Sequence, residues 1–172
     1  MAKYVVAFDF DVVIIDSARE AFFTSAKTYE EITGKHVSGE EMAKAYVVGR
    51  GFSLNAESNC TLTRLISENP KINFSNYSQA KFDEEKQKDK AIAEKFAELF
   101  RVNRKKQAGT KEWLEIQKPF PHVKNAIEEL SKKFPFYVVT TKEKHSVMAL
   151  FNYYKFSIPE EKIIFDHHAE TK

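Results

Sequence analysis

The sequence predicts an α/β fold, with a Rossmann-like parallel sheet core and an inserted α-helical domain. Short apolar runs rich in β-branched and aromatic residues stand near the N-terminus and again in the last third of the chain. Single helical segments separate the later runs, which implies right-handed crossovers and parallel strands. Between these two regions, charged and helix-forming residues dominate and strand-like runs are scarce. The core is therefore expected to be interrupted by a helical insert.

Composition limits the classes of function. The 172 residues, 42% of them apolar and 30% charged, suit a globular protein with one well-buried core. Lys and Arg outnumber Asp and Glu by only 27 to 25, so no broad positive field favours nucleic acid or an anionic membrane. The single cysteine, Cys60, cannot form an internal disulfide, and no apolar run is long enough to cross a bilayer. A cytoplasmic location is expected, with Cys60 as a buried structural thiol.

The first strand is predicted at residues 4–8, a continuous apolar run that suits burial on both faces of a parallel sheet. Two aspartates follow, and a second apolar stretch at 12–15 precedes Asp16-Ser17, which offers a helix start. A small ordered flap is expected between strand and helix. The acids interrupt the apolar run, unlike the core of a secretory leader, so this segment belongs to the fold.

The insert is predicted over residues 18–117, so the core comprises residues 1–17 and 118–172. Breaks at Gly34, 49–51, 69–70 and 108–109 divide the insert into roughly four helices. The longest is expected at 81–104. After the insert the chain returns to α/β alternation, with helices predicted at 123–133 and 143–154 and strands at 136–140 and 162–165.

Asp9 and Asp11 carry the clearest chemical signal. They lie two positions apart where the first strand ends, so an extended backbone directs both side chains to the same side of the sheet edge. Two ionised carboxylates in one cleft repel each other unless they share a proton or a cation, which makes Mg²⁺ a natural ligand. For an arbitrary D-x-D the alternative is a pair of solvated loop acids.

The full string at residues 8–17, FDFDVVIIDS, resembles the first motif of the haloacid dehalogenase-like hydrolase superfamily. The resemblance implies that Asp9 attacks a phosphoryl group, that Asp11 protonates the leaving oxygen and later activates water, and that both hold Mg²⁺. Members that cleave carbon–halogen bonds generally lack the second aspartate, so Asp11 favours phosphate chemistry. Val12 stands where similar members usually carry glycine.

Residues 136–142, FYVVTTK, resemble the second motif of the family, an apolar strand that ends in a hydroxyl. The resemblance implies that Thr140 and Thr141 bind the phosphate, helped by backbone N–H groups at a helix N-terminus. Thr140-x-x-Glu143 is equally a capping box that needs no ligand.

Residues 119–130 are similar to the segment that leads from an α-helical cap back into the core of these hydrolases, with His122 in place of the usual glycine. The insert resembles the C1-type cap, which usually admits small phosphorylated metabolites. Within it, Arg50 between Gly49 and Gly51 is the candidate for a substrate contact on a flexible loop, against the alternative of a solvated surface arginine.

Lys172 falls about where the third-motif lysine of the family is expected to steady the phosphate. No fourth motif follows, so the acids that complete the Mg²⁺ shell are expected to be missing, together with the C-terminal part of the core. The first strand then becomes a sheet edge, which predicts a dimer, a domain-swapped form or poor solubility. His167 and His168 are expected in a polar loop.

Two functions follow from these residues. The first is a Mg²⁺-dependent phosphatase for a small phosphorylated metabolite, with an aspartyl-phosphate intermediate; a phosphomutase would share its residues. The second is a non-catalytic binding or scaffold protein that kept the fold and lost the metal site. Neither nucleic acid nor a membrane is an expected partner.

Overall fold

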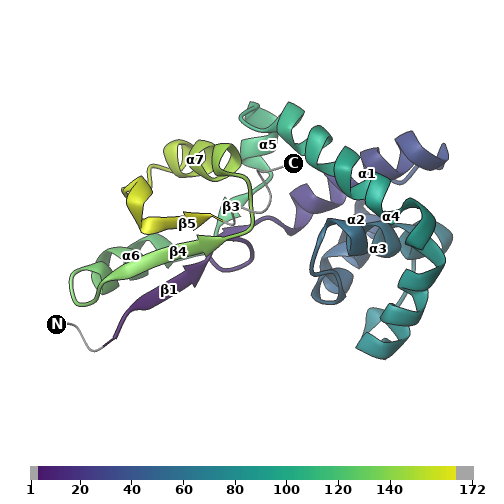
Figure 1. The fold of residues 1–172 in the computed structure, drawn as a ribbon, viewed down its shortest axis with the longest axis horizontal. Helices are drawn as coiled ribbons and strands as arrows, with labels where there is room; N and C mark the ends of the chain where they lie inside the picture. The colour runs from purple at the N-terminus through teal and green to yellow at the C-terminus, as the bar shows by residue number, and fades with distance from the viewer. Residues whose placement is uncertain (1–3, 166–172) are drawn as a thin grey trace. The chain divides into compact units, whose positions relative to one another are not determined.

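The computed structural model describes residues 4–165 of the chain. Backbone contacts divide the chain into two compact units (Figure 1). Among the described residues, the sheet unit comprises 4–17 and 108–165, and the insert comprises Ala18–Gln107. The mixed α/β architecture with a parallel sheet agrees with the predicted fold class.

The sheet unit is built on three parallel strands in the order β1-β4-β5. Val6 of β1 pairs with Phe136 of β4, and Val138 of β4 pairs with Ile163 of β5. The later elements lie within a few residues of their predicted bounds. In chain order the strands and helices of this unit are β1 (Val6–Asp9), β2 (Ile15–Asp16), α5 (Lys111–Glu115), β3 (Lys118–Pro119), α6 (Val123–Ser131), β4 (Phe136–Thr140), α7 (Lys144–Tyr153) and β5 (Ile163–Phe165).

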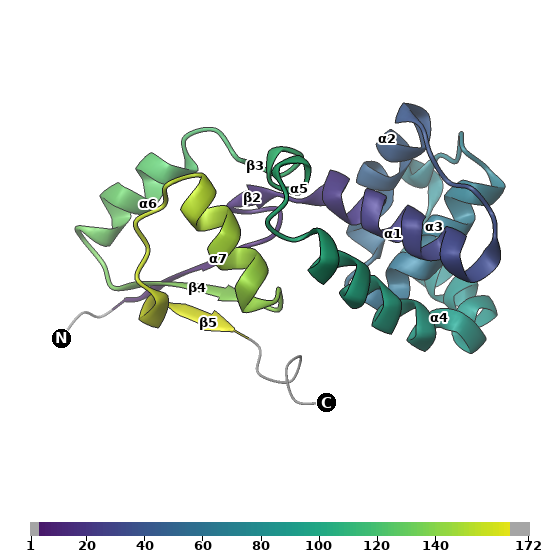
Figure 2. The ribbon, with the colours of Figure 1, turned by 90° about the horizontal axis from the view of Figure 1, so that it is seen from above.

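One face of this sheet forms the core of the unit. Alternate residues of β4 are buried, and Val138 is fully enclosed together with Ile127 of α6 and Leu150 of α7. Both helices belong to the same apolar cluster. This is expected, because the strand order β1-β4-β5 takes both connections in one direction along the sheet, and right-handed connections in one direction place their helices on the same face. Figure 2 shows α6 and α7 on the same side of the strands.

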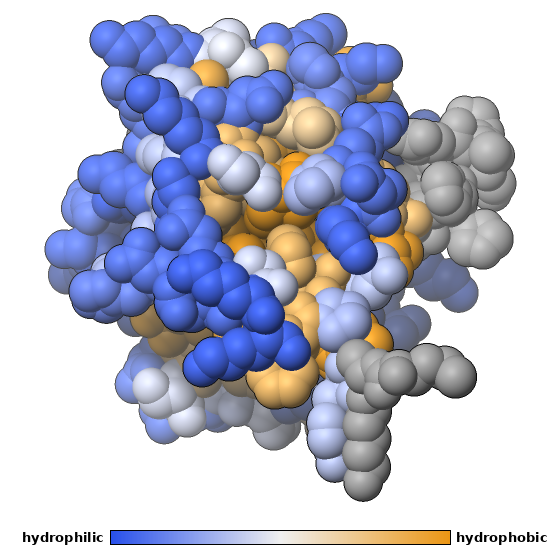
Figure 3. Space-filling model, turned by 90° about the vertical axis from the view of Figure 1, so that its left-hand side faces the viewer, coloured by the Kyte–Doolittle hydropathy of each residue, from blue (hydrophilic) through white to orange (hydrophobic). Residues whose placement is uncertain are grey.

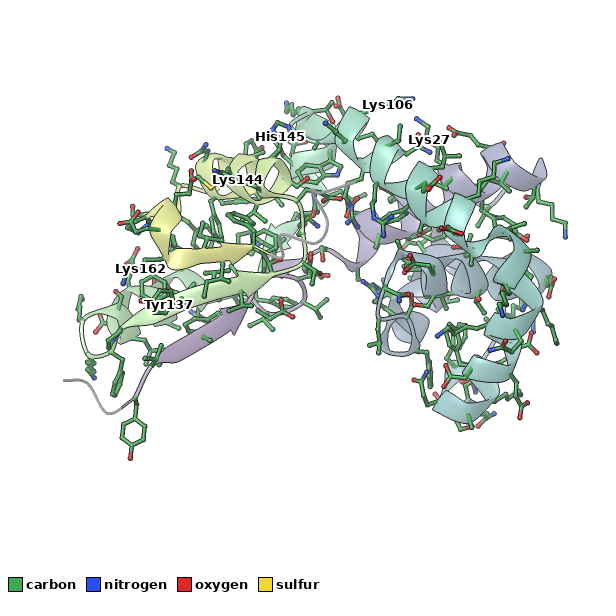
Figure 4. The ribbon with its side chains drawn as sticks, in the orientation of Figure 1. Lys27, Lys106, Tyr137, Lys144, His145 and Lys162 are labelled. Carbon is green, nitrogen blue, oxygen red and sulfur yellow. The ribbon has the colours of Figure 1, made fainter. Side chains whose placement is uncertain are left out.

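The opposite face of the sheet remains open among residues 4–165. Val139 is 43% exposed and its neighbour Ile164 is 50% exposed, although parallel sheets are usually covered on both faces. On the same face Lys162 Nζ lies 4.7 Å from the centre of the Tyr137 ring, and Figure 4 labels this pair. Figure 3, in which the left-hand side of Figure 1 faces the viewer, shows apolar residues gathered near the centre of the view among hydrophilic ones.

A second, two-stranded sheet was not predicted. β2 and β3 pair antiparallel, with Ile15 opposite Pro119 and Asp16 opposite Lys118. They flank the chain that leaves for the insert and returns from it. Each has only two residues, so neither produces a periodic pattern in the sequence.

The insert is all-helical in its regular structure, as predicted. Apolar side chains of its four α-helices form one cluster around the fully buried Phe22, Tyr46, Leu62, Phe82 and Phe96. The predicted breaks fall between the helices, and the longest helix contains the predicted range 81–104. The elements are α1 (Ala18–Thr33), α2 (Glu40–Gly49), η1 (Arg50–Phe52), α3 (Ala56–Glu68), η2 (Phe74–Asn76) and α4 (Gln79–Gln107).

The segment 108–117, which the sequence analysis assigned to the insert, packs in the sheet unit instead. Trp113 and Leu114 of α5 are buried in the same apolar cluster as the sheet. The Tyr154 hydroxyl donates to the Leu114 carbonyl at 3.0 Å and holds α5 beside α7. Helical spacing alone does not tell which core an apolar face joins.

Candidate functional site

Asp9 is the last residue of β1, at the carboxyl end of the sheet where α/β folds bind ligands. Its side chain is exposed, and its Oδ1 accepts a hydrogen bond from the Phe10 backbone N–H at 2.7 Å. The Phe10 ring is fully buried and meets the Phe151 ring edge-on at 5.3 Å between centroids. Phe10 therefore anchors the backbone directly after Asp9, while the carboxylate of Asp9 stays open to solvent.

Asp11 follows at the start of a tight turn. It forms an isolated bridge with Ile15, and the Val12 N–H donates to the Ile15 carbonyl at 2.8 Å. Val12 has a φ of 61°, in the left-handed region where a β-branched residue is a genuine outlier. This turn is the observed form of the ordered flap, and it fixes the backbone from which the Asp11 side chain extends.

Lys142, which the sequence analysis did not single out, contacts Asp11 in the folded chain. Its Nζ lies 3.1 Å from Oδ1 of Asp11, and only 1% of its side chain is exposed, against 29% for Asp11. The ammonium also lies 5.9 Å from the ring centres of both Phe10 and Trp113. The sequence feature that could have indicated Lys142 is its place in FYVVTTK, two positions after the hydroxyl at the strand end.

Thr140 is buried at the end of β4, and its Oγ1 accepts a hydrogen bond from the Lys142 backbone N–H at 3.0 Å. The capping-box alternative for Thr140 is wrong, because the N-cap residue of α7 is Glu143 and it makes no side-chain cap hydrogen bond. Thr141 is exposed. Lys172, like His167 and His168, lies outside the described residues.

The structure thus gathers Thr140, Lys142 and Asp11 through hydrogen bonds, beside the strand that ends in Asp9. Within residues 4–165 it shows no group of three or more His, Cys, Asp or Glu side chains that could hold a metal ion. Mg²⁺ is commonly held by one or two carboxylates plus substrate phosphate and water. The exposed carboxylate of Asp9 fits that role, whereas one oxygen of Asp11 already contacts an ammonium.

Arg50 lies in the insert, half-buried in the short helix η1. The expected flexible flank before it is not observed, since Gly49 is buried with a φ of −74° at the end of α2. A Cβ on Gly49 would approach Leu62 Cδ1 to 2.6 Å, so packing requires this glycine. Burial raises the pKa of the neighbouring Tyr46, and the charge of Arg50 partly opposes that effect.

Cys60 is fully buried, as predicted, and burial raises the pKa of its thiol to about 12. The thiolate is the nucleophilic form, so this residue is not a candidate for catalysis. No helix in residues 4–165 has the length and apolar character needed to cross a membrane.

Neither protein-family models nor curated proteins match the sequence. Among solved structures, a haloacid dehalogenase-like family hydrolase from Streptococcus pneumoniae superposes with a TM-score of 0.53 at 17% identity, over 94% of this chain and 60% of that one. The fold is that of the haloacid dehalogenase-like hydrolases. A hydrolase of family IA, variant 3, from Entamoeba histolytica superposes with a TM-score of 0.51 at 18% identity, over 98% and 63% of the two chains.

The chain therefore spans about three-fifths of the length of both solved hydrolases. At these identities the similarity establishes the dehalogenase-like fold and not the activity. In that fold the described residues place an aspartate at the end of β1 and a threonine at the end of the adjacent β4.

Proposed function

We propose that this chain carries the nucleophile and the acid–base group of a Mg²⁺-dependent phosphatase that acts on a small phosphorylated metabolite. The observation that supports the proposal most is the pairing of Asp11 with the buried Lys142 directly beside the strand that ends in Asp9. A buried cation so close to one acid of an acid pair is typical of sites built for charged chemistry.

In the proposed reaction, a carboxylate oxygen of Asp9 forms a bond to phosphorus while the bond from phosphorus to the leaving oxygen breaks. Asp11 gives its proton to that oxygen and then takes a proton from the water that cleaves the aspartyl-phosphate. The Thr140 hydroxyl accepts from the Lys142 N–H, so it retains its own proton to donate to a phosphate oxygen.

Mg²⁺, when bound, neutralises phosphate charge as the transition state forms. Asp9 is its proposed ligand, and Asp11 is a second ligand only where the ion competes with the ammonium of Lys142. Arg50 in the insert is the proposed contact for the rest of the substrate. Lys172 is proposed to bind phosphate with Thr140 and Thr141. A phosphomutase would use the same residues with a sugar phosphate in place of water.

A non-catalytic binding protein is the second candidate. The Lys142 ammonium already compensates the charge of Asp11, and three-ligand metal clusters are absent from the described part of the chain. Such a protein would bind a phosphorylated ligand at the same sheet edge without turning it over.

Phosphate release from a panel of phosphomonoesters with Mg²⁺ tests the first candidate. Wild type should turn over at least one substrate, and Asp9→Asn should abolish turnover because the amide is a poor nucleophile. Asp83→Asn, which removes an exposed acid in α4, is the matched control and should retain activity.

Beryllium fluoride, which mimics a phosphoryl group on aspartate, provides a second measurement by ¹⁹F NMR. A bound signal in wild type and Asp83→Asn, lost in Asp9→Asn, would support the nucleophile. Absence of both turnover and adduct, with phosphate binding retained in calorimetry, would instead support the binding protein.

A further inference from the structure

Lys142 is held at three points inside the sheet unit. Its backbone N–H donates to Thr140 Oγ1, and its Nζ contacts Asp11 Oδ1. The same Nζ also lies near two aromatic rings. A buried lysine loses side-chain entropy and hydration, and it keeps its position only when a charge partner compensates the loss. Asp11 supplies that partner.

The two ends of this pair differ in their access to solvent. The Lys142 side chain is enclosed, whereas the Asp11 side chain is partly exposed. A lysine that binds phosphate directly needs its ammonium at the surface of the site, as a point charge. The burial of Lys142 therefore favours action through Asp11 and not on the substrate itself.

We propose that Lys142 is a positioning residue, which fixes the carboxylate of Asp11 for proton transfer to the leaving oxygen. This inference rests on the proposed phosphatase function. With Oδ1 held at 3.1 Å by the ammonium, rotation of the carboxylate about its last bond is restricted. Asp11 is then aimed before the substrate arrives, which removes an orientational cost from the proton-transfer step.

The dependence of the rate on the leaving group separates this role from a structural one. An alkyl phosphate expels a strongly basic oxygen that needs the proton of Asp11 as the P–O bond breaks, whereas 4-nitrophenyl phosphate expels a stable anion that needs little protonation. Loss of the Asp11 orientation should thus slow the first substrate much more than the second.

The test compares Lys142→Met with wild type on both substrates. The kcat/KM for the alkyl phosphate should fall roughly 10- to 100-fold, within the range that proton transfer contributes. The value for 4-nitrophenyl phosphate should fall only about threefold, with KM nearly unchanged, because uniform substrate binding is not affected. Lys144→Met, at an exposed lysine at the start of α7 that pairs with Glu160, is the matched control and should match wild type.

A double-mutant cycle gives the decisive measurement. In an Asp11→Asn background, Lys142→Met should have no further effect on 4-nitrophenyl phosphate turnover. The carboxylate through which Lys142 is proposed to act is absent from that background. An equal loss on both substrates, or a loss that persists in the Asp11→Asn background, would overturn the positioning role in an active enzyme. An inactive wild type without a beryllium fluoride adduct would instead reject the phosphatase proposal itself.

Discussion

Arg64 Nε donates a hydrogen bond to Asp89 Oδ1 at 2.8 Å and joins α3 to α4 inside the insert. The Asp89 side chain is only 3% exposed. Two further acids complete the cluster, with Glu85 at 2.7 Å and Glu68 at 2.9 Å from the guanidinium. Burial acts to lower the pKa of Arg64, but the hydrogen bonds to Glu85 and Asp89 outweigh it, so the pKa is raised.

Removing this arginine should destabilise the insert strongly. Arg64→Met leaves the buried Asp89 charge without its guanidinium, and we expect a loss of roughly 3–5 kcal/mol in the free energy of unfolding. Urea denaturation measures it. Arg64→Leu combined with Asp89→Leu should recover most of the loss, since no buried charge is then left behind. Arg101→Met, at an exposed pair with Glu57, should cost at most about 1 kcal/mol.

The stability of the insert should also depend on pH through Glu85. Hydrogen bonds from Lys88 and then from Arg64 lower the pKa of this carboxyl. Its folded pKa therefore lies below the unfolded value of about 4.3. The stabilisation is complete above that value and is lost as the pH falls through the folded pKa.

Glu85→Gln should flatten the loss of unfolding free energy below about pH 4.3, because the variant has no carboxyl to titrate at this position. Lys88→Met should flatten it in part. Lys90→Met removes an exposed charge of the same sign from the same helix and serves as control. A wild-type slope retained in Glu85→Gln would contradict the assignment.

The stability of the chain should respond differently to alanine at Gly49 and at Gly51. A Cβ at Gly49 would lie 2.6 Å from Leu62 and 2.7 Å from Phe74, whereas nothing lies within 4 Å of a Cβ at Gly51. We expect Gly49→Ala to cost about 1–3 kcal/mol by overpacking. Gly51→Ala should be near neutral, and thermal denaturation of the two variants distinguishes close packing from loop flexibility as the reason for these glycines.

Much of the fold was predictable because long elements leave periodic patterns. The strand at 136–140 is observed with the predicted bounds, and α4 covers the predicted 81–104. The pairing of β2 with β3 was not predictable, since it joins two-residue strands far apart in the sequence. Lys142 was missed for a related reason, because its role depends on Asp11, a residue that only the folded sheet brings near.

Two positions at which the sequence departs from the motifs that it resembles proved informative. Val12 and His122, where the resemblance led us to expect glycine, both adopt positive φ, at 61° and 64°. The backbone keeps the conformation that glycine favours, although the glycine is absent. A non-glycine residue in the left-handed region destabilises the folded chain by roughly 1–2 kcal/mol.

Val12→Gly should therefore raise the free energy of unfolding, by up to about 1 kcal/mol after the larger entropy of the unfolded glycine chain is subtracted. Val13→Gly is the matched control, because Val13 is exposed in the same turn and its φ is not positive. The control should lose about 0.5–1 kcal/mol. Denaturant titration of both variants and wild type measures these changes in unfolding free energy. A loss of stability in Val12→Gly would contradict the prediction, because the positive φ of Val12 would then cost nothing that glycine removes.

The open sheet face and the β1 edge lead us to expect self-association. Among residues 4–165, β1 pairs only with β4, and Val139 and Ile164 leave apolar surface exposed beside it. Val139→Glu should lower the apparent mass in sedimentation velocity if a second copy covers this face. Leu54→Glu, at an equally apolar and 84% exposed position in the insert, should not change the mass.

The small β2–β3 pair bears on the order in which the chain acquires structure. Ile15 and Pro119 meet only after the intervening chain has been closed into a loop, and the entropy lost in that closure grows with loop length. A folded insert shortens the effective loop, since Arg104 near the end of α4 contacts Glu20 near the start of α1 at 3.1 Å. We therefore expect the helical insert to fold before the β2–β3 pair forms. Pulse-labelling hydrogen exchange should show the amides of the insert protected before those of β4.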